Sequence, residues 1–147
     1  MDTQERIREK WKNAVCAGNT GYLALPEVLL RKQAKLGITT TELTVLINIL
    51  SFWWYEDRLP FPGNKAIADR MGVEPRTVQR TIKSLESKGL VRRERVLQPD
   101  GQWRRYFDPS GLVMKLEDHA VSIQLANESR AAANDTIAVN QLGGRAH

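Results

Sequence analysis

The sequence predicts a mainly α-helical fold with one small β-hairpin, an α+β class, in a chain of 147 residues that suits a single compact core. Three observations predict it. Apolar residues recur at helical spacing over much of the chain. Two short helical segments surround a tight glycine turn near the middle, and two strand-like segments around a Pro-Asp-Gly turn follow directly.

Three helices are expected ahead of the central turn. The first lies within residues 1–21, where Ile7 and Trp11 begin an apolar stripe. The second opens on Pro26 as a first-turn proline and is stopped by Gly37. The third follows a threonine cap at residues 39–41 and runs to about residue 55, with apolar side chains again at a period of 3.6.

Residues 58–62 contain two prolines and are expected to form an extended connector. Residues 64–71 and 75–88 are then expected to be two helices joined by a tight turn. Gly72 is suited to the positive φ that ends the first of them, and Pro75 to the first position of the second.

Two strands are predicted at residues 90–97 and 103–107. The four residues Gln98-Pro99-Asp100-Gly101 join them and place proline second and glycine fourth, which is typical of a type I turn. A further amphipathic helix is expected from Pro109 to about residue 126. Residues 127–147 are rich in Ala, Asn and Gly with weak periodicity, so we expect a loosely ordered tail there.

This order of elements is the winged helix-turn-helix arrangement. The run AIADRMGVEPRTVQRTIKSLESKGLVRR (residues 66–93) resembles the winged-helix domains of bacterial regulators and of plasmid- and phage-type replication proteins. Residues 25–37 and 51–54 are similar to a subgroup of that family. The expected organisation is an N-terminal helix (1–21), a winged helix-turn-helix DNA-binding domain (22–108), a C-terminal helix available for dimerisation (109–126) and the tail (127–147).

The positive charge of the chain is concentrated in one segment. Residues 59–105 contain eleven Lys and Arg against five Asp and Glu, whereas the formal charge of the whole chain is +5. A basic stripe confined to one structural unit is typical of a nucleic-acid-binding protein, because each phosphate that it neutralises releases a condensed counterion. A solvated basic surface is the alternative reading of the charge alone.

The helix over residues 75–88 has two chemically different sides. At about 100° per residue, Val78, Ile82 and Leu85 cluster on one side and are expected to face the core. The opposite side carries Arg76, Arg80, Lys83 and Ser87, with Thr77 and Gln79 at its flanks. Arg can bridge guanine O6 and N7, and Gln can pair with adenine, so this side is suited to reading the major groove.

Further contacts are expected around this helix. Lys65, at the start of the preceding helix, is a candidate for a phosphate contact. The hairpin contributes Arg93, Arg95, Gln102, Arg104 and Arg105 as candidates for the flanking backbone or the minor groove. Side chains of a strand alternate between its two faces, so these arginines cannot all reach the same groove. Trp103 is expected to pack under the hairpin, and Trp53 and Trp54 to pack in the core or at an interface.

Other functional classes lack support in the sequence. There is no Gly-rich phosphate loop and no nucleophile motif, so we expect no enzyme and no cofactor. One cysteine and two histidines cannot form a Cys/His zinc cluster, and we expect no metal site. No apolar stretch is long enough for a bilayer and no secretory signal is recognised, so we expect a cytoplasmic protein without a membrane partner or an evident small-molecule ligand.

Three hypotheses remain open from the sequence. The first is a homodimeric, sequence-specific transcriptional regulator, a repressor of double-stranded DNA targets, paired through its flanking helices. The second, implied by the resemblance, is a plasmid or phage origin-binding protein. The third is a winged helix used as a protein-interaction module, against which the cationic helix side argues, because the cores of protein interfaces are depleted in charge.

Overall fold

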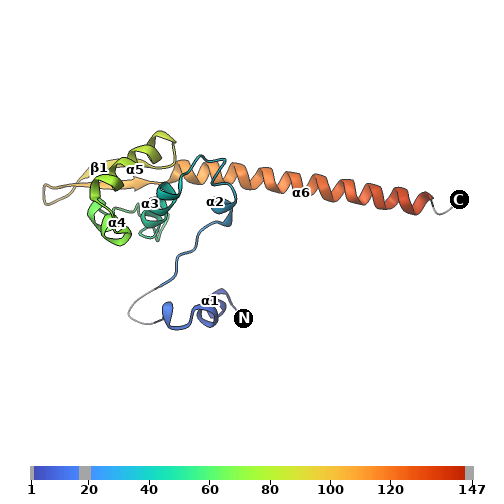
Figure 1. Ribbon diagram of the computed structural model, residues 1–147, viewed down its shortest axis with the longest axis horizontal. Helices are drawn as coiled ribbons and strands as arrows, with labels where there is room; N and C mark the ends of the chain where they lie inside the picture. Colours follow the sequence, from blue (N-terminus) through green and yellow to red (C-terminus); the bar gives the residue numbers. More distant parts are fainter. Residues whose placement is uncertain (1, 17–20, 145–147) are drawn as a thin grey trace.

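The computed structural model describes residues 2–16 and 21–144; the rest of the expected N-terminal segment and of the expected tail lies outside this description. In chain order the elements are α1 (Thr3–Trp11), the 3₁₀ turn η1 (Lys12–Ala14), α2 (Glu27–Arg31), α3 (Thr40–Leu50), α4 (Asn64–Met71), α5 (Pro75–Ser87), β1 (Arg92–Leu97), β2 (Trp103–Asp108) and α6 (Ser110–Gly144). The helices α3, α4 and α5 lie together. The hairpin projects beyond them at one end of the molecule, and α6 extends from the opposite end (Figure 1). The expected mainly helical fold with a β-hairpin is confirmed.

The central helix-turn-helix forms as the sequence predicts. Gly72 adopts φ 68° and ψ 34°, the left-handed conformation that ends α4, and its N–H donates to the Ala68 carbonyl. Pro75 occupies the first turn of α5, where its missing N–H costs no helical hydrogen bond. The predicted bounds of α4 are confirmed, and those of α5 are correct to within one residue.

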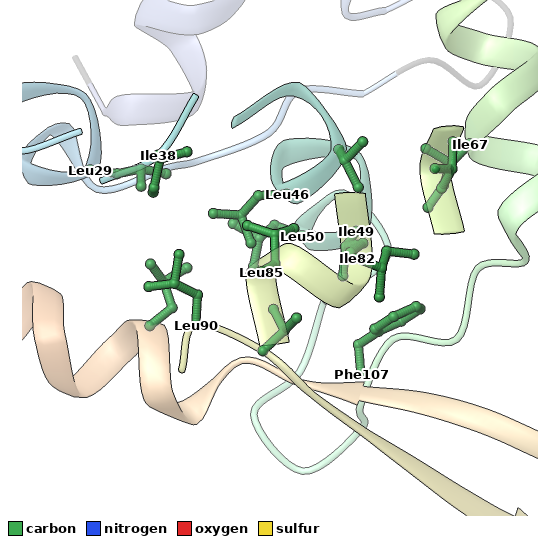
Figure 2. Packing of buried hydrophobic residues seen from close by; sticks show 14 of the residues in the cluster. Leu29, Ile38, Leu46, Ile49, Leu50, Ile67, Ile82, Leu85, Leu90 and Phe107 are labelled. Carbon is green, nitrogen blue, oxygen red and sulfur yellow. The ribbon is translucent and has the colours of Figure 1, made fainter. Parts of the chain in front are cut away.

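The core lies where α3, α5 and the base of the hairpin meet. Figure 2 shows Leu46 and Ile49 of α3 near Ile82 and Leu85 of α5, with Phe107 of the hairpin beside them. The four aliphatic side chains are fully buried. Burying each of them contributes roughly 1.5–3 kcal/mol relative to leaving it in water. This packing fixes the rotation of α5 about its axis, and therefore which of its sides meets solvent.

A buried polar cluster joins the start of α3 to the end of α5. The Glu42 carboxylate is almost fully buried, and it accepts hydrogen bonds from Lys88 Nζ at 2.6 Å and from Ser84 Oγ at 3.0 Å. Glu42 and Thr39 also form a reciprocal capping box at the start of α3. Burial on its own would raise the pKa of Glu42, but the hydrogen bonds from Lys88 and Thr39 outweigh it and lower the pKa to about 2.

The hairpin is anchored to the helical body at its base. The strands β1 and β2 pair antiparallel, with Arg93 opposite Phe107 and Leu97 opposite Trp103. The N–H of Phe107 donates to the Pro60 carbonyl at 2.8 Å, so the extended connector supports the hairpin from one side. In the turn, Gly101 adopts φ 84° and donates to the Gln98 carbonyl at 3.0 Å. The predicted hairpin and extended connector are confirmed.

Two helices end earlier than the sequence predicts. The helix α3 stops at Leu50 instead of residue 55, because tight i to i+3 hydrogen bonds close its last turn and the chain then reverses through a bridge between Tyr55 and Arg58. The helix α2 ends at Arg31, and the segment before Gly37 forms turns. In both places local turn hydrogen bonds prevail over the apolar periodicity.

The prediction that the last helix ends near residue 126 is wrong. The helix α6 continues to Gly144, so most of the expected loose tail is helical. Alanine has the highest helix propensity of all residues, and residues 127–142 contain four alanines and no glycine or proline. Weak apolar periodicity there indicates a helix without a packing partner in the chain and does not indicate a coil.

Candidate nucleic-acid interface

The outward side of α5 is a continuous polar and cationic surface. The residues on it that are exposed to solvent are Arg76, Gln79, Arg80, Lys83 and Ser87. The residues on its inward side, Val78, Ile82 and Leu85, are 0% exposed. Among the described residues no carboxylate pairs with Arg76, Arg80 or Lys83. These three charges are therefore available to an anionic partner, and the expected orientation of the helix is confirmed.

Two of the predicted positions on α5 are partly engaged in the helix itself. Thr77 is half-buried and its carbonyl accepts from Thr81 Oγ1 at 2.7 Å. The Ser87 hydroxyl is exposed but donates to the Ser84 carbonyl at 2.7 Å. The bond at Thr77 uses the backbone carbonyl and leaves its hydroxyl unaffected, and the Ser87 hydroxyl can still accept a hydrogen bond. The cationic residues carry most of the recognition potential of this surface.

The arginines of the hairpin divide between its two faces, as the strand alternation requires. Arg93, Arg95 and Arg105 share the face from which Phe107 enters the core, because directly opposed residues point to the same side. Arg104 lies on the other face, opposite Val96. The register therefore places the four arginines on two faces, three on one and Arg104 on the other, as strand alternation predicts.

Arg93 is the predicted contact that the structure positions least favourably for DNA. Its side chain is only 19% exposed, and its Nε lies 2.5 Å from Glu86 Oε1 of α5. This ion pair ties the base of the hairpin to the end of α5. Arg93 therefore positions the hairpin relative to the cationic helix surface, and its guanidinium is not free in the way that those of Arg95 and Arg105 are.

Arg104 rests on an aromatic platform that the sequence analysis did not identify. Its guanidinium carbon lies 4.4 Å from the ring centre of Phe61, and Nη1 donates to Tyr106 Oη at 3.4 Å. Phe61 and Tyr106 form an edge-to-face pair with ring centres 5.3 Å apart. The buried prolines on either side of Phe61 force its ring outward, and this alternation was the available signal in the sequence.

A polar cleft of about 450 Å³ separates the start of α4 from the hairpin. Gly63 and Asn64 form its helical side, and Gln102, Arg104 and Arg105 contribute to its hairpin side. A helix N-terminus beside two arginines suits a phosphate group electrostatically. Lys65 lies in the first turn of α4, where its side chain is 82% exposed and its Nζ pairs with Asp69 Oδ2 at 2.9 Å. Such an exposed pair is weak enough to exchange for a phosphate.

The expectation that Trp103 packs under the hairpin is wrong. Trp103 does not pack under the hairpin: 57% of its surface is exposed at the tip, with the Arg95 guanidinium carbon 4.9 Å from its ring centre. Trp54 is also exposed, whereas Trp53 packs against the core as expected. The hairpin extends past the helical body (Figure 1).

Within residues 2–16 and 21–144, no group of three or more His, Cys, Asp or Glu side chains is arranged to hold a metal ion. No helix in the same part of the chain is both long and apolar enough to cross a membrane.

Comparison with known proteins finds one family model that matches part of the chain. Residues 36–91 match the family model described as a helix-turn-helix domain, and this range contains α3, α4 and α5. With the hairpin that follows, the fold is a winged helix-turn-helix. No curated protein matches the chain at a significant level.

Several solved structures resemble the chain. The N-terminal domain of DnaD protein from Geobacillus kaustophilus is 23% identical over 88% of this chain and 99% of that one, with a TM-score of 0.55. YusO protein from Bacillus subtilis is 17% identical over 96% and 99% of the two chains, with a TM-score of 0.42. A MarR-family transcriptional regulator from Silicibacter pomeroyi is 23% identical over 65% and 61%, with a TM-score of 0.39. The likeness to the Geobacillus domain supports the fold.

Proposed function

We propose that this protein is a double-stranded DNA-binding transcriptional regulator that reads a specific sequence with α5 and acts as a homodimeric repressor. The observation that carries the proposal is the free cationic side of α5. Arg76, Arg80 and Lys83 are exposed and lack a described carboxylate partner, while the opposite side of the helix is locked into the core. A helix held in this way after a tight turn is suited to the major groove.

The roles within the interface follow from position. Arg76 lies in the first turn of α5 and Gln79, Arg80 and Lys83 follow on the same side, so these residues are assigned to base edges and adjacent phosphates. Lys65 and Arg104 flank this helix and are assigned to phosphates, together with Arg105. Binding to phosphates supplies affinity for any sequence, and the α5 contacts supply the preference for one.

The homodimer is supported by an unpartnered face of α6. At about 100° per residue, Met114, Val121, Leu125 and Val139 fall within about 40° of one another, and all four are exposed. They lie on the side of α6 opposite Leu116, which is buried against the domain. A long helix derives most of its stability from packing such a face, and a second copy is the simplest partner for it. Pairing would set two α5 helices on one duplex, as for half-sites roughly 34 Å apart.

The first experiment is selection of binding sites from random duplex DNA, followed by affinity measurements for the winner and a scrambled control across a salt range. An enriched inverted repeat with a large preference over the scrambled duplex supports the dimeric regulator. Enrichment of direct repeats would instead support binding at a replication origin. Strong binding to a protein partner with no enriched DNA would contradict the proposal.

Repression needs its own test, since occupying a promoter is enough to block transcription. Expression of a reporter gene placed downstream of the selected site is expected to decrease when the wild-type protein is present. The Arg80→Ala variant should relieve this effect. Arg31→Ala is the matched control, because Arg31 is an exposed arginine on α2 that pairs with Glu27 3.6 Å away and lies outside α5 and the hairpin. A rise in reporter output with the wild-type protein would indicate activation.

A further inference from the structure

The tip of the hairpin exposes an apolar pair that the functions proposed above do not use. Leu97 and Trp103 are directly opposite each other in the register, at the last paired position before the turn. They are 55% and 57% exposed, and Trp103 also lines the cleft between the hairpin and the start of α4. A hairpin in water is expected to place polar residues at such a tip, so two large apolar side chains there indicate a partner.

Positive charge on the same face identifies the chemistry of that partner. The next pair toward the body is Arg95 opposite Arg105, and both are exposed. Like charges directly opposite each other destabilise a strand pair, so this arrangement becomes favourable only when an anion lies against it. The Arg95 guanidinium carbon lies 4.9 Å from the ring centre of Trp103, which keeps charge and indole together. An apolar tip next to two arginines fits a nucleic acid, in which charged phosphates surround bases that can stack on an aromatic ring.

The position of the tip indicates which part of the DNA it would contact. The hairpin projects beyond the helical body and its base is tied to α5 through the ion pair of Arg93 with Glu86 (Figure 1). With α5 in the major groove as proposed above, the hairpin beside it is the element placed to meet the flanking backbone or the minor groove, as the sequence also predicts (Figure 1). Proteins that bend DNA insert apolar side chains between base steps from that groove.

We propose that Trp103, backed by Leu97, inserts at a base step of the minor groove and bends the duplex, with Arg95 and Arg105 holding the phosphates on either side. This inference rests on the proposed DNA-binding function and adds a deformation of the DNA to it. Flexible pyrimidine–purine steps are easier to unstack than A-tracts, so the hairpin gives sequence preference at positions that α5 does not touch.

The test measures bending directly. A duplex of about 30 base pairs, carrying the selected site and labelled at its two ends with a donor and an acceptor dye, is titrated with the full-length protein. Energy transfer is expected to rise on binding, and more strongly when a TA step lies under the hairpin than when an A-tract does. Trp103→Ala should abolish the rise and weaken binding about tenfold, while leaving the salt dependence of binding unchanged because no charge is removed. Trp103→Phe should restore part of both.

Val96→Ala is the matched control. Val96 is adjacent to Leu97 and is also exposed, but it points to the opposite face of the hairpin. The inference would be overturned if Val96→Ala reduced bending as much as Trp103→Ala does. Tight binding by the wild-type protein without any change in energy transfer would also overturn it. Preference for single-stranded over duplex DNA through Trp103 would overturn it as well. Failure of the wild-type protein to bind any duplex would overturn the proposed function itself, so the two failures are distinguishable.

Discussion

The helices α5 and α6 differ in how far other parts of the chain cover their apolar residues. The inward side of α5 is fully buried by other elements of the same chain, and its free side is cationic. In the described part of α6 the buried apolar side chains, Leu112 and Leu116, lie near its start, and the exposed residues beyond them include Val121, Leu125 and Val139. Figure 1 shows the far part of α6 extending away from the domain. A helix completed within the chain can present a charged surface for recognition, whereas α6 presents an apolar surface that suits assembly.

The sharpest test of this comparison is a cavity on the inward side of α5. Ile82→Ala removes a fully buried side chain from the centre of the core and is expected to lower the free energy of unfolding by about 2–5 kcal/mol. Urea unfolding followed by circular dichroism measures it. Lys83→Ala, one residue further on the exposed side, is the control and should change the free energy by no more than about 0.5 kcal/mol. Equal losses in the two variants would show that α5 is not oriented as described.

A second large effect is expected from the cluster that locks the end of α5 to α3. The pKa of Glu42 falls from 4.5 to about 2 on folding, so its carboxylate contributes stability that is fully present above pH 4.5 and is lost as the pH falls toward 2. The shift corresponds to about 3 kcal/mol. Unfolding free energies measured between pH 6 and pH 2 should show this loss.

The matched variant for this effect is Glu42→Gln. Its unfolding free energy should lie below that of the wild-type protein at neutral pH, because Lys88 loses its carboxylate partner and keeps the Gly37 carbonyl, and the difference should narrow toward pH 2. A difference that stays constant over the whole range would assign the acid sensitivity to another carboxylate. Asp108 is the alternative, because hydrogen bonding from the Ser110 N–H lowers its pKa too.

The same contrast explains which features could be predicted from the sequence. Val78, Ile82 and Leu85 have their partners in the chain, so helical spacing alone predicted the orientation of α5 and the exposure of its arginines. Gly72 and Pro75 predicted the turn before it through their backbone preferences alone. Features of this kind depend on local conformation and on one buried side.

Features that depend on distant contacts, or on partners outside the chain, could not be predicted in this way. The engagement of Arg93 with Glu86 requires knowing how the hairpin sits against α5, and the exposure of Trp103 requires knowing that the tip extends past the body. Amphipathic spacing does not reveal the full length of α6, because the apolar periodicity weakens after residue 126 while the helix continues to Gly144. An alanine-rich stretch forms a helix through its backbone propensity, with or without a buried side.

A smaller effect separates sequence reading from phosphate binding across the interface. Arg80→Ala is expected to lose roughly 1–3 kcal/mol of preference for the cognate base pair. Arg104→Ala should weaken binding to all sequences alike and flatten the slope of log affinity against log salt by about 0.9. Competition binding with selected and scrambled duplexes, repeated at several salt concentrations, measures both quantities. If Arg80→Ala weakened both duplexes equally, α5 would be a phosphate contact and not a reading helix.

The smallest expected change in domain stability comes from the exposed side of α6, and there the effect appears in assembly. Val121→Ser and Leu125→Ser, combined, should alter the unfolding free energy of a monomer by no more than about 0.5 kcal/mol, yet halve the solution mass measured by sedimentation.

The salt dependence of dimerisation is an independent test of pairing through this face. Four acidic residues lie within about 60° of this face, namely Glu117, Asp118, Glu128 and Asp135. Two copies paired here repel one another, so the dimer should tighten as salt screens that repulsion, whereas DNA binding weakens. A dimer that instead dissociates with added salt would indicate that α6 pairs with a basic segment such as α1, which carries Arg6, Arg8 and Lys10.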